Sequence, residues 1–265
     1  MSGKNNEDNF AVSAYIISPN NPTPSVFAIV SDGIGGHKAG EIASEMSVNL
    51  ISAAVEKRES GSPLAVFEQS FLKTSKAIFE KAEENTQFKG MGATAACAWV
   101  IGQLLYIAYA GDSRIYLVRD QKIRQLTRDH TWVQEALDKG IINPTSGTFR
   151  NHPNFHVIRR YLGSEKPTEP DLRLYLEPGE SDKRAKTNQG MTLLAGDVLL
   201  MCTDGLSDLI HEHEIRSMLY GRTLHQTAEA LINLANERGG HDNITVVILG
   251  VPWDTKKMDP GWKPG

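Results

Sequence analysis

Cysteine and long apolar runs are both scarce in this chain of 265 residues, which has only two cysteines. Two cysteines cannot form a disulfide scaffold or a cysteine-rich zinc site. No apolar run approaches the roughly 18–20 residues of a membrane span, and no basic segment followed by an apolar one opens the chain. These absences favour a soluble protein of the cytoplasm without a membrane span.

Basic residues are not in excess either. Lysine and arginine number 28 against 32 acidic residues, which gives a net charge of −4. Proteins that bind nucleic acid or anionic membranes contact phosphates and usually carry a basic surface. The densest basic spots, such as Arg159-Arg160, are too short to provide one. We therefore expect no nucleic-acid partner.

The chain does contain enough apolar material for a sizeable core, because 40% of its residues are hydrophobic. Their spacing predicts helices at residues 38–57, 64–82, 131–139, 212–220 and 224–238. It predicts short strands at residues 27–30, 94–101, 104–110, 115–118, 123–126, 198–202 and 244–249. The four strands between residues 94 and 126 favour an antiparallel meander. Runs of strands beside paired helices indicate an α+β fold with layered antiparallel sheets.

Aspartates recur where apolar strands end beside glycine. Asp32, Asp112 and Asp204 each follow such a strand, and Asp242 precedes the last one. Taken singly, each is explained by an ordinary turn, in which Asp and Gly are common. Strands of paired antiparallel sheets can also bring several such ends to one edge, where the carboxylates would repel one another. A hard divalent cation such as Mg²⁺ or Mn²⁺ would resolve that repulsion.

Two cations that share one aspartate have a chemical use. A water between them becomes hydroxide near neutral pH and can attack a phosphoryl group in line. No covalent nucleophile is then required, which agrees with the absence of a G-x-S-x-G motif from this sequence. Cys97 and Cys202 lie within apolar strands, so we expect both to be inert core thiols.

Seven short motifs follow one another in a recognisable order. They are NEDN (6–9), SDGIGGH (31–37), GMGAT (90–94), GDSR (111–114), DHTWV (129–133), TDGL (203–206) and GHDNIT (240–245). Over about residues 4 to 251, their order and spacing resemble the protein phosphatase 2C (PPM) family of metal-dependent Ser/Thr protein phosphatases, in its bacterial branch. The resemblance implies a four-layer α-β-β-α sandwich, with two central antiparallel sheets covered by helix pairs.

The resemblance also implies two bound ions of Mn²⁺ or Mg²⁺ together with a third ion. It implies the ligands of these ions as well. Asp32 resembles the aspartate that bridges both metals, and Gly33 the residue that lends one of them its backbone carbonyl. Asp204 and Asp242 match the ligands of the second metal, which makes Asp32, Asp204 and Asp242 the expected catalytic set. Asp112 matches a ligand of the third metal, together with Asp204.

Further residues match the surroundings of the metals. Asp208 is expected to assist at the third metal, while Glu7 and Asp8 resemble outer-sphere acids that hold metal-bound waters. Residues 131–170 resemble the mobile segment beside the active site that selects protein substrates, and we call this segment the flap. We expect a phosphatase domain over residues 1–252 that includes the flap, a tail or linker over 253–265, and an exposed loop over 180–189.

Two positions depart from the family pattern. Animal members carry a proposed general acid, a histidine, where this chain has Ile34, and His37 is a candidate substitute three residues further along. The phosphate-binding arginine of the family is replaced by Gly3, and the strand that usually precedes it is missing, so we expect a truncated start. The resemblance therefore leaves both the proton donor and the substrate-binding residue unassigned.

The sequence as a whole predicts an enzyme that hydrolyses phosphoserine and phosphothreonine on proteins with a metal-bridging hydroxide. Its expected partners are a Ser/Thr kinase and the substrates of that kinase, and its expected state is a monomer. The alternative is a catalytically weak regulatory or scaffold module that keeps the fold and the metals and binds partner proteins. Gly3 and Ile34 favour the alternative, whereas the intact set of aspartates opposes it.

Overall fold

The computed structural model describes residues 5–35, 38–57, 61–143 and 152–252. Gly3, His37, the tail and residues 144–151 of the flap lie outside these ranges. Among the described residues, no helix is both long enough and apolar enough to cross a membrane.

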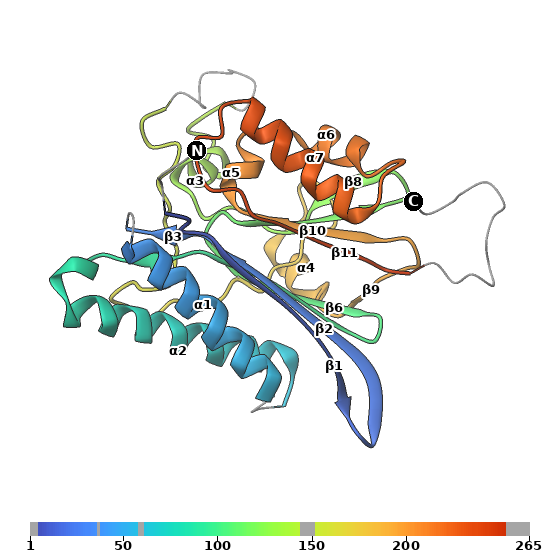
Figure 1. The fold of residues 1–265 in the computed structure, drawn as a ribbon, viewed down its shortest axis with the longest axis horizontal. Helices are drawn as coiled ribbons and strands as arrows, with labels where there is room; N and C mark the ends of the chain where they lie inside the picture. The colour runs from blue at the N-terminus through green and yellow to red at the C-terminus, as the bar shows by residue number, and fades with distance from the viewer. Residues whose placement is uncertain (1–4, 36–37, 58–60, 144–151, 253–265) are drawn as a thin grey trace.

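Two antiparallel sheets lie at the centre of the molecule (Figure 1). The first has the strand order β1-β2-β5-β6-β9, and its strands are β1 (Asn9–Ser18), β2 (Asn21–Ser31), β5 (Ala95–Ile101), β6 (Leu104–Ala110) and β9 (Met191–Thr192). The second has the order β11-β10-β7-β8, and its strands are β7 (Arg114–Arg119), β8 (Lys122–Gln125), β10 (Val198–Cys202) and β11 (Val246–Gly250). A separate short pair joins β3 (Gly33–Ile34) to β4 (Gly92–Ala93).

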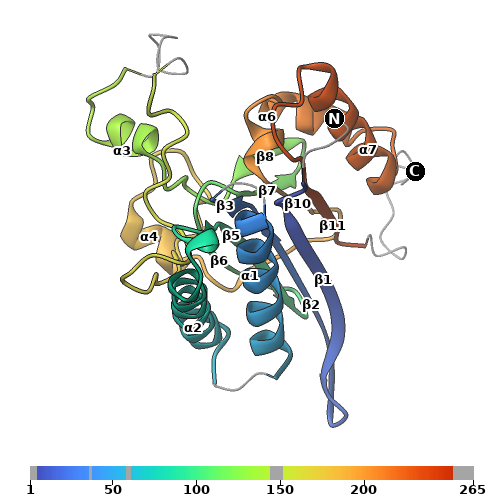
Figure 2. The ribbon, with the colours of Figure 1, turned by 60° about the vertical axis from the view of Figure 1, so that its left-hand side comes forward.

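Helices cover the outer face of each sheet. In Figures 1 and 2, α1 (Lys38–Lys57) and α2 (Pro63–Glu84) lie on the first sheet, and α6 (Glu212–Met218) and α7 (Leu224–Glu237) lie on the second. The shorter helices are a 3-10 turn η1 (Thr86–Phe88), α3 (Trp132–Asp138), α4 (Asp182–Thr187) and α5 (Asp204–Ser207). The layers are therefore α-β-β-α, and the expected α+β sandwich is confirmed.

Alternate residues of β2 belong to two different cores. Phe27 and Ile29 face the helices α1 and α2, where the Phe27 ring lies 6.4 Å from that of Phe67. Ala28 and Val30 point the other way and belong to the core between the two sheets. All of these side chains are fully buried. A strand covered on both faces has no polar alternation, which is why residues 26–30 of β2 form a continuous apolar run.

The chain changes sheets directly after β6. The expected meander over residues 94–126 is therefore wrong, because β5 pairs with β6 and β7 with β8, while β6 and β7 lie in different sheets. Residues 111–113 make the crossover. Gly111 has a φ of +104°, and a Cβ on it would overlap the side chain of Thr94. Glycine thus permits the turn that carries Asp112 between the sheets.

Two segments rich in loop-forming residues are in part regular. Residues 18–25, whose prolines and asparagines resemble a turn, turn only at Pro19 and Asn20, and β2 begins at Asn21. Prolines are tolerated in this part of β2 because it pairs with β1 alone. The expected loop over 180–189 contains α4, and its Gln189 side chain binds the backbone of Ile107 in β6.

The flap leaves the sheets and returns to them. It begins at Thr131, whose hydroxyl caps α3, and Thr131 also forms a bridge with Ile158. A second bridge joins Leu162 to Ala93 in β4. Figure 2 shows α3 set apart from both helix pairs. The described parts of the flap are therefore anchored at both ends beside the crossover and β4.

Candidate metal centre

Five aspartates from distant parts of the chain act on one another electrostatically. Asp32 follows β2, Asp112 lies in the crossover, Asp204 opens α5 and Asp242 precedes β11, while Asp8 precedes β1. We call these five residues the acidic cluster. Burial raises the pKa of Asp32 well above its usual value, and the carboxylates of the other four members raise it further. The strand ends therefore meet, as the sequence predicts.

The other buried members are perturbed in the same direction. Burial raises the pKa of Asp204 to about 7, with further increases from Asp208 and Asp242. Burial is also the largest cause for Asp8, whose pKa rises to about 6. Asp112 is raised well above its usual pKa by burial and then by the charge of Asp204. Several carboxylates so close together resist ionisation unless a cation joins them.

Hydroxyl side chains fix the backbone around Asp32. The Asp32 amide donates to the hydroxyl of Thr94 over 2.9 Å, and the Thr94 amide donates to the Asp32 carbonyl, also over 2.9 Å. The same Thr94 hydroxyl lies 2.7 Å from that of Ser113, which follows Asp112. Thr94 thus ties the end of β2 to the crossover. The sequence motif contained this residue, but nothing in the pattern indicated its bonding role.

Thr203 performs a similar task for Asp8. Its hydroxyl donates to the Asp8 carboxylate over 2.8 Å and accepts from the Thr245 amide over 3.1 Å. A backbone bond from Thr203 to the Thr245 carbonyl closes the link between β10 and β11. Asp8 is buried by this contact. Its position near the N-terminus is therefore set by the two C-terminal strands.

Gly33 allows α1 to approach the acidic cluster closely. A Cβ on Gly33 would overlap the carbonyl oxygen of Gly40 in α1, and a Cβ on Gly40 would overlap the carboxylate of Glu7. The Gly33 amide donates to the Glu7 carbonyl over 3.1 Å, and the Glu7 amide donates to the Asn243 side chain over 2.9 Å. Two glycines therefore place Glu7 and the Gly33 backbone beside the first turn of α1.

Among the described residues, the charge of an arginine acts on one member of the acidic cluster. Arg114 is close enough to lower the pKa of Asp112, but its guanidinium forms a bidentate pair with Asp129, with Nη2 2.6 Å from Oδ2. Oδ1 of Asp112 and Oδ1 of Asp204 are both buried, and neither has a hydrogen-bond partner in the described part of the chain. Buried, unpartnered carboxylate oxygens are what a divalent cation with oxygen ligands requires. The donor set thus fits Mg²⁺ or Mn²⁺.

His130 connects the crossover to the flap. Its Nδ1 accepts from the Gly111 amide over 3.1 Å, and its Nε2 lies 3.1 Å from Asp171. Burial lowers the pKa of His130, and a ring that accepts through Nδ1 is neutral. The backbone of His130 accepts from Arg159 in the flap over 2.7 Å. One buried imidazole therefore supports the turn that carries Asp112.

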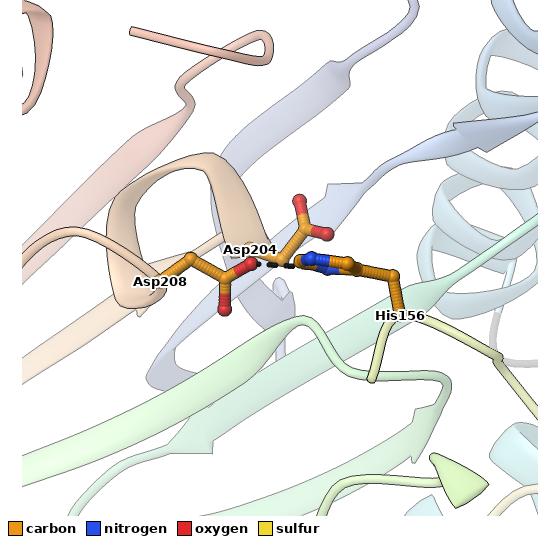
Figure 3. A group of neighbouring side chains, drawn as sticks. All are labelled: His156, Asp204 and Asp208. Atoms are coloured by element: carbon orange, nitrogen blue, oxygen red, sulfur yellow. Dashed lines mark ion pairs between the residues drawn. The ribbon is translucent and has the colours of Figure 1, made fainter. Parts of the chain in front are cut away.

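A histidine from the flap lies close to α5. Figure 3 shows His156 directed at Asp204 and Asp208, and its Nδ1 is 3.3 Å from Oδ2 of Asp208. Sequence reasoning missed His156, because it stands outside every motif and a lone histidine carries no spacing signal. Only the fold brings it to the aspartates.

The comparisons with known proteins agree with this geometry. The family model of protein phosphatase 2C matches residues 3–136. The serine/threonine phosphatase stp of Listeria monocytogenes is 36% identical over 249 residues, which cover 92% of this chain and 89% of that protein. The chain belongs to the protein phosphatase 2C family.

Solved structures of this family share the whole fold. The serine/threonine phosphatase PstP/Ppp of Mycobacterium tuberculosis is 31% identical, with a TM-score of 0.77 over 95% of this chain and 94% of that one. The catalytic domain of PstP, solved in complex with two manganese ions, is 30% identical, with a TM-score of 0.69 over 91% of this chain and 96% of that one. The expected phosphatase 2C family is thus confirmed.

The structure places most of the expected site residues in one region of this phosphatase 2C fold. Asp242 is exposed, whereas Asp32, Gly33 and Asp204 are partly buried. Gly3 and His37, the two residues considered for substrate binding and proton donation, lie outside the described ranges. Ile34 is an apolar residue of β3 and offers no proton.

The two cysteines behave as expected. Cys97 in β5 and Cys202 in β10 are fully buried. Burial raises the pKa of the Cys97 thiol well above its usual value and that of Cys202 to about 12. Neither thiol ionises near neutral pH, so neither can act as a nucleophile there.

Proposed function

We propose that this chain removes phosphate from phosphoserine and phosphothreonine on proteins in a reaction that depends on bound Mn²⁺ or Mg²⁺. The observation that carries the proposal is the acidic cluster, with two buried carboxylate oxygens that have no hydrogen-bond partner among the described residues. Membership of the protein phosphatase 2C family supports the same chemistry. The proposed partners are phosphorylated proteins, among them a Ser/Thr kinase and its substrates, met in the cytoplasm by a monomer.

The chain would hold the ions through oxygen atoms. Asp32 would bridge two ions, the Gly33 carbonyl would bind one of them, and Asp204 and Asp242 would bind the other. A third ion would be bound by Asp112 and Asp204, with help from Asp208. When bound, such ions make water a better nucleophile at neutral pH and offset the charge of the phosphoryl group.

The protein's own residues would prepare the site for those ions. Because burial and mutual repulsion raise the pKa values of Asp8, Asp32 and Asp204, ion binding must displace protons from them. Thr94 and Thr203 hold the backbone of Asp32 and the carboxylate of Asp8 in place, so little reorganisation accompanies binding. Residues 1–252 would form the phosphatase domain, and the flap beside α5 would meet the protein substrate.

The test is turnover of a phosphothreonine peptide and of p-nitrophenyl phosphate with Mn²⁺, with Mg²⁺ and with EDTA. We expect hydrolysis only with a divalent ion, and a loss of at least about a hundredfold in kcat for Asp32→Asn. Asp120→Asn is the matched control, because Asp120 is an exposed turn residue at the end of β7. Full activity in EDTA would refute the proposal.

The same experiment distinguishes the rival function. A regulatory or scaffold module would bind Mn²⁺ and phosphopeptide but would hydrolyse neither the phosphothreonine peptide nor p-nitrophenyl phosphate. Calorimetric titration of Mn²⁺ alongside the kinetics separates the two outcomes. Tight ion binding without measurable kcat would favour the scaffold module over the enzyme.

A further inference from the structure

The flap brings a nitrogen ligand to a region otherwise rich in carboxylates. The candidate ligand atoms of His156, Asp204 and Asp208 all lie within 4.8 Å of one another. Figure 3 shows that the two aspartates belong to α5 and its C-cap, whereas the imidazole comes from the flap. One residue of the flap therefore lies beside the single helical turn of α5.

The backbone holds His156 in this place. The Phe155 amide donates to the His152 carbonyl over 2.9 Å, and the Val157 amide donates to the Asn154 carbonyl over 3.2 Å. Val157 in turn accepts from Trp132 at the start of α3 over 2.8 Å. His156 thus directly precedes Val157, whose carbonyl accepts the hydrogen bond that ties the flap to α3. Its position follows from hydrogen-bonded turns rather than from a single side-chain contact.

The spacing suits a common ion. Ligand atoms about 2.1 Å from one ion lie roughly 3–4 Å apart, and the 3.3 Å between His156 and Asp208 falls in that range. The His156 side chain is 70% exposed and that of Asp208 28%, so an ion can enter from solvent. Asp204 offers a further carboxylate ligand atom within 4.8 Å of those of His156 and Asp208.

An ion pair between protonated His156 and Asp208 explains less. That pair would involve Asp208 alone, although Asp204 offers a ligand atom within the same 4.8 Å. A divalent ion between the three side chains would use both aspartates and the neutral imidazole as ligands. The geometry therefore favours coordination over simple charge pairing.

We propose that His156 supplies a nitrogen ligand to a divalent transition-metal ion that Asp204 and Asp208 also bind. The proposal rests on the metal-dependent function proposed above, and it adds a flap residue to an otherwise all-oxygen set. Imidazole suits Mn²⁺ and the later transition metals better than Mg²⁺, so this position discriminates between the two cofactors. A bound ion at this position joins the flap to α5.

Pulsed electron paramagnetic resonance of the Mn²⁺-loaded enzyme tests the proposal directly. We expect a ¹⁴N coupling of the imidazole type in the unchanged protein, and its loss in His156→Ala. Titration with Mn²⁺ should show one site weakened by at least about tenfold in that variant, while titration with Mg²⁺ should change much less. His152→Ala is the matched control, because His152 is a flap histidine stacked on Trp132 with no place in the cluster.

Two results would overturn the proposal. One is an identical ¹⁴N signal and identical Mn²⁺ affinities in the unchanged protein and in His156→Ala. The other is the absence of any imidazole coupling from the unchanged protein. If that protein nevertheless hydrolyses phosphopeptide with Mn²⁺, the proposed function stands and only the role of His156 is wrong. If it neither binds Mn²⁺ nor hydrolyses the peptide, both proposals fail.

Discussion

Asp204 illustrates how a single side chain can favour function over stability. Its pKa rises to about 7 because it is buried and because Asp208 and Asp242 lie near it. Below about pH 4 the carboxyl is protonated in both the folded and the unfolded chain. As the pH rises through 7, the folded chain must give up a proton that the unfolded chain has already lost. Ionisation at this position therefore destabilises the metal-free fold.

We expect the metal-free protein to lose stability between about pH 4 and pH 7, because the folded state then binds more protons than the unfolded state. Asp204→Asn should raise the metal-free Tm at pH 7.5 by a few degrees, since ~1 kcal/mol corresponds to roughly 2–4 °C at this chain length. Calorimetry in EDTA at several pH values measures the effect, with Asp120→Asn as the control. A metal-free Tm that rises steadily with pH would contradict the expectation.

At the scale of elements, the approach of α1 to β3 depends on two facing glycines. A side chain at Gly33 would meet the backbone of Gly40, which no rotamer change can move aside. The first turn of α1 would have to shift, and Glu7 and the Gly33 carbonyl would shift with it. A contact of this kind connects helix packing to the proposed metal ligands.

Gly33→Ala should therefore weaken Mn²⁺ binding by at least about tenfold and lower stability by about 1–3 kcal/mol, the usual range for overpacking. Gly250→Ala in β11 is the control, because its Cβ would meet only the flexible end of Leu224. Urea denaturation and Mn²⁺ titration on both variants measure the two effects. Equal behaviour of Gly33→Ala and Gly250→Ala would show that the close approach is not needed.

The local sequence pattern predicted most of the helices and strands. It could not predict which strands pair with one another. The apolar spacing of residues 38–57 coincides with α1, and that of 64–82 falls within α2. The strands from β5 to β8 were also found, but not the change of sheet at Gly111, because neighbours in a sheet are chosen by tertiary packing. The aspartates were predicted from strand ends and the family resemblance. His156 was not, since only the fold brings the flap to α5.

At the scale of the whole molecule, the acidic cluster joins the two sheets. Asp32 is supplied by the end of β2 in the first sheet, and Asp204 and Asp242 by the ends of β10 and β11 in the second. Repulsion among these carboxylates would oppose the packing of the two sheets at this edge when no ion is bound. Ions that bind only the folded chain favour the packed sandwich.

Removal of metal should therefore lower the stability of the whole domain in one transition. Mn²⁺ at about 100 times its Kd adds about 2.7 kcal/mol, which corresponds to roughly 5–10 °C in Tm. Scanning calorimetry with Mn²⁺ and then with EDTA measures the difference, and calcium-free buffer of equal ionic strength is the control. An unchanged Tm would mean that the ions do not connect the two sheets.

The distance along the chain between the members of the acidic cluster has a consequence for biosynthesis. Asp8 is fixed by Thr203, which the ribosome adds 195 residues later and which also accepts from the Thr245 amide. A nascent chain that has completed the first sheet and its two helices therefore has Asp8 and Asp32 but no partner strands to complete the site. Assembly of the proposed metal site must therefore wait until β10 and β11 have emerged from the ribosome. A nascent chain that holds only the first sheet and its two helices thus cannot complete that site.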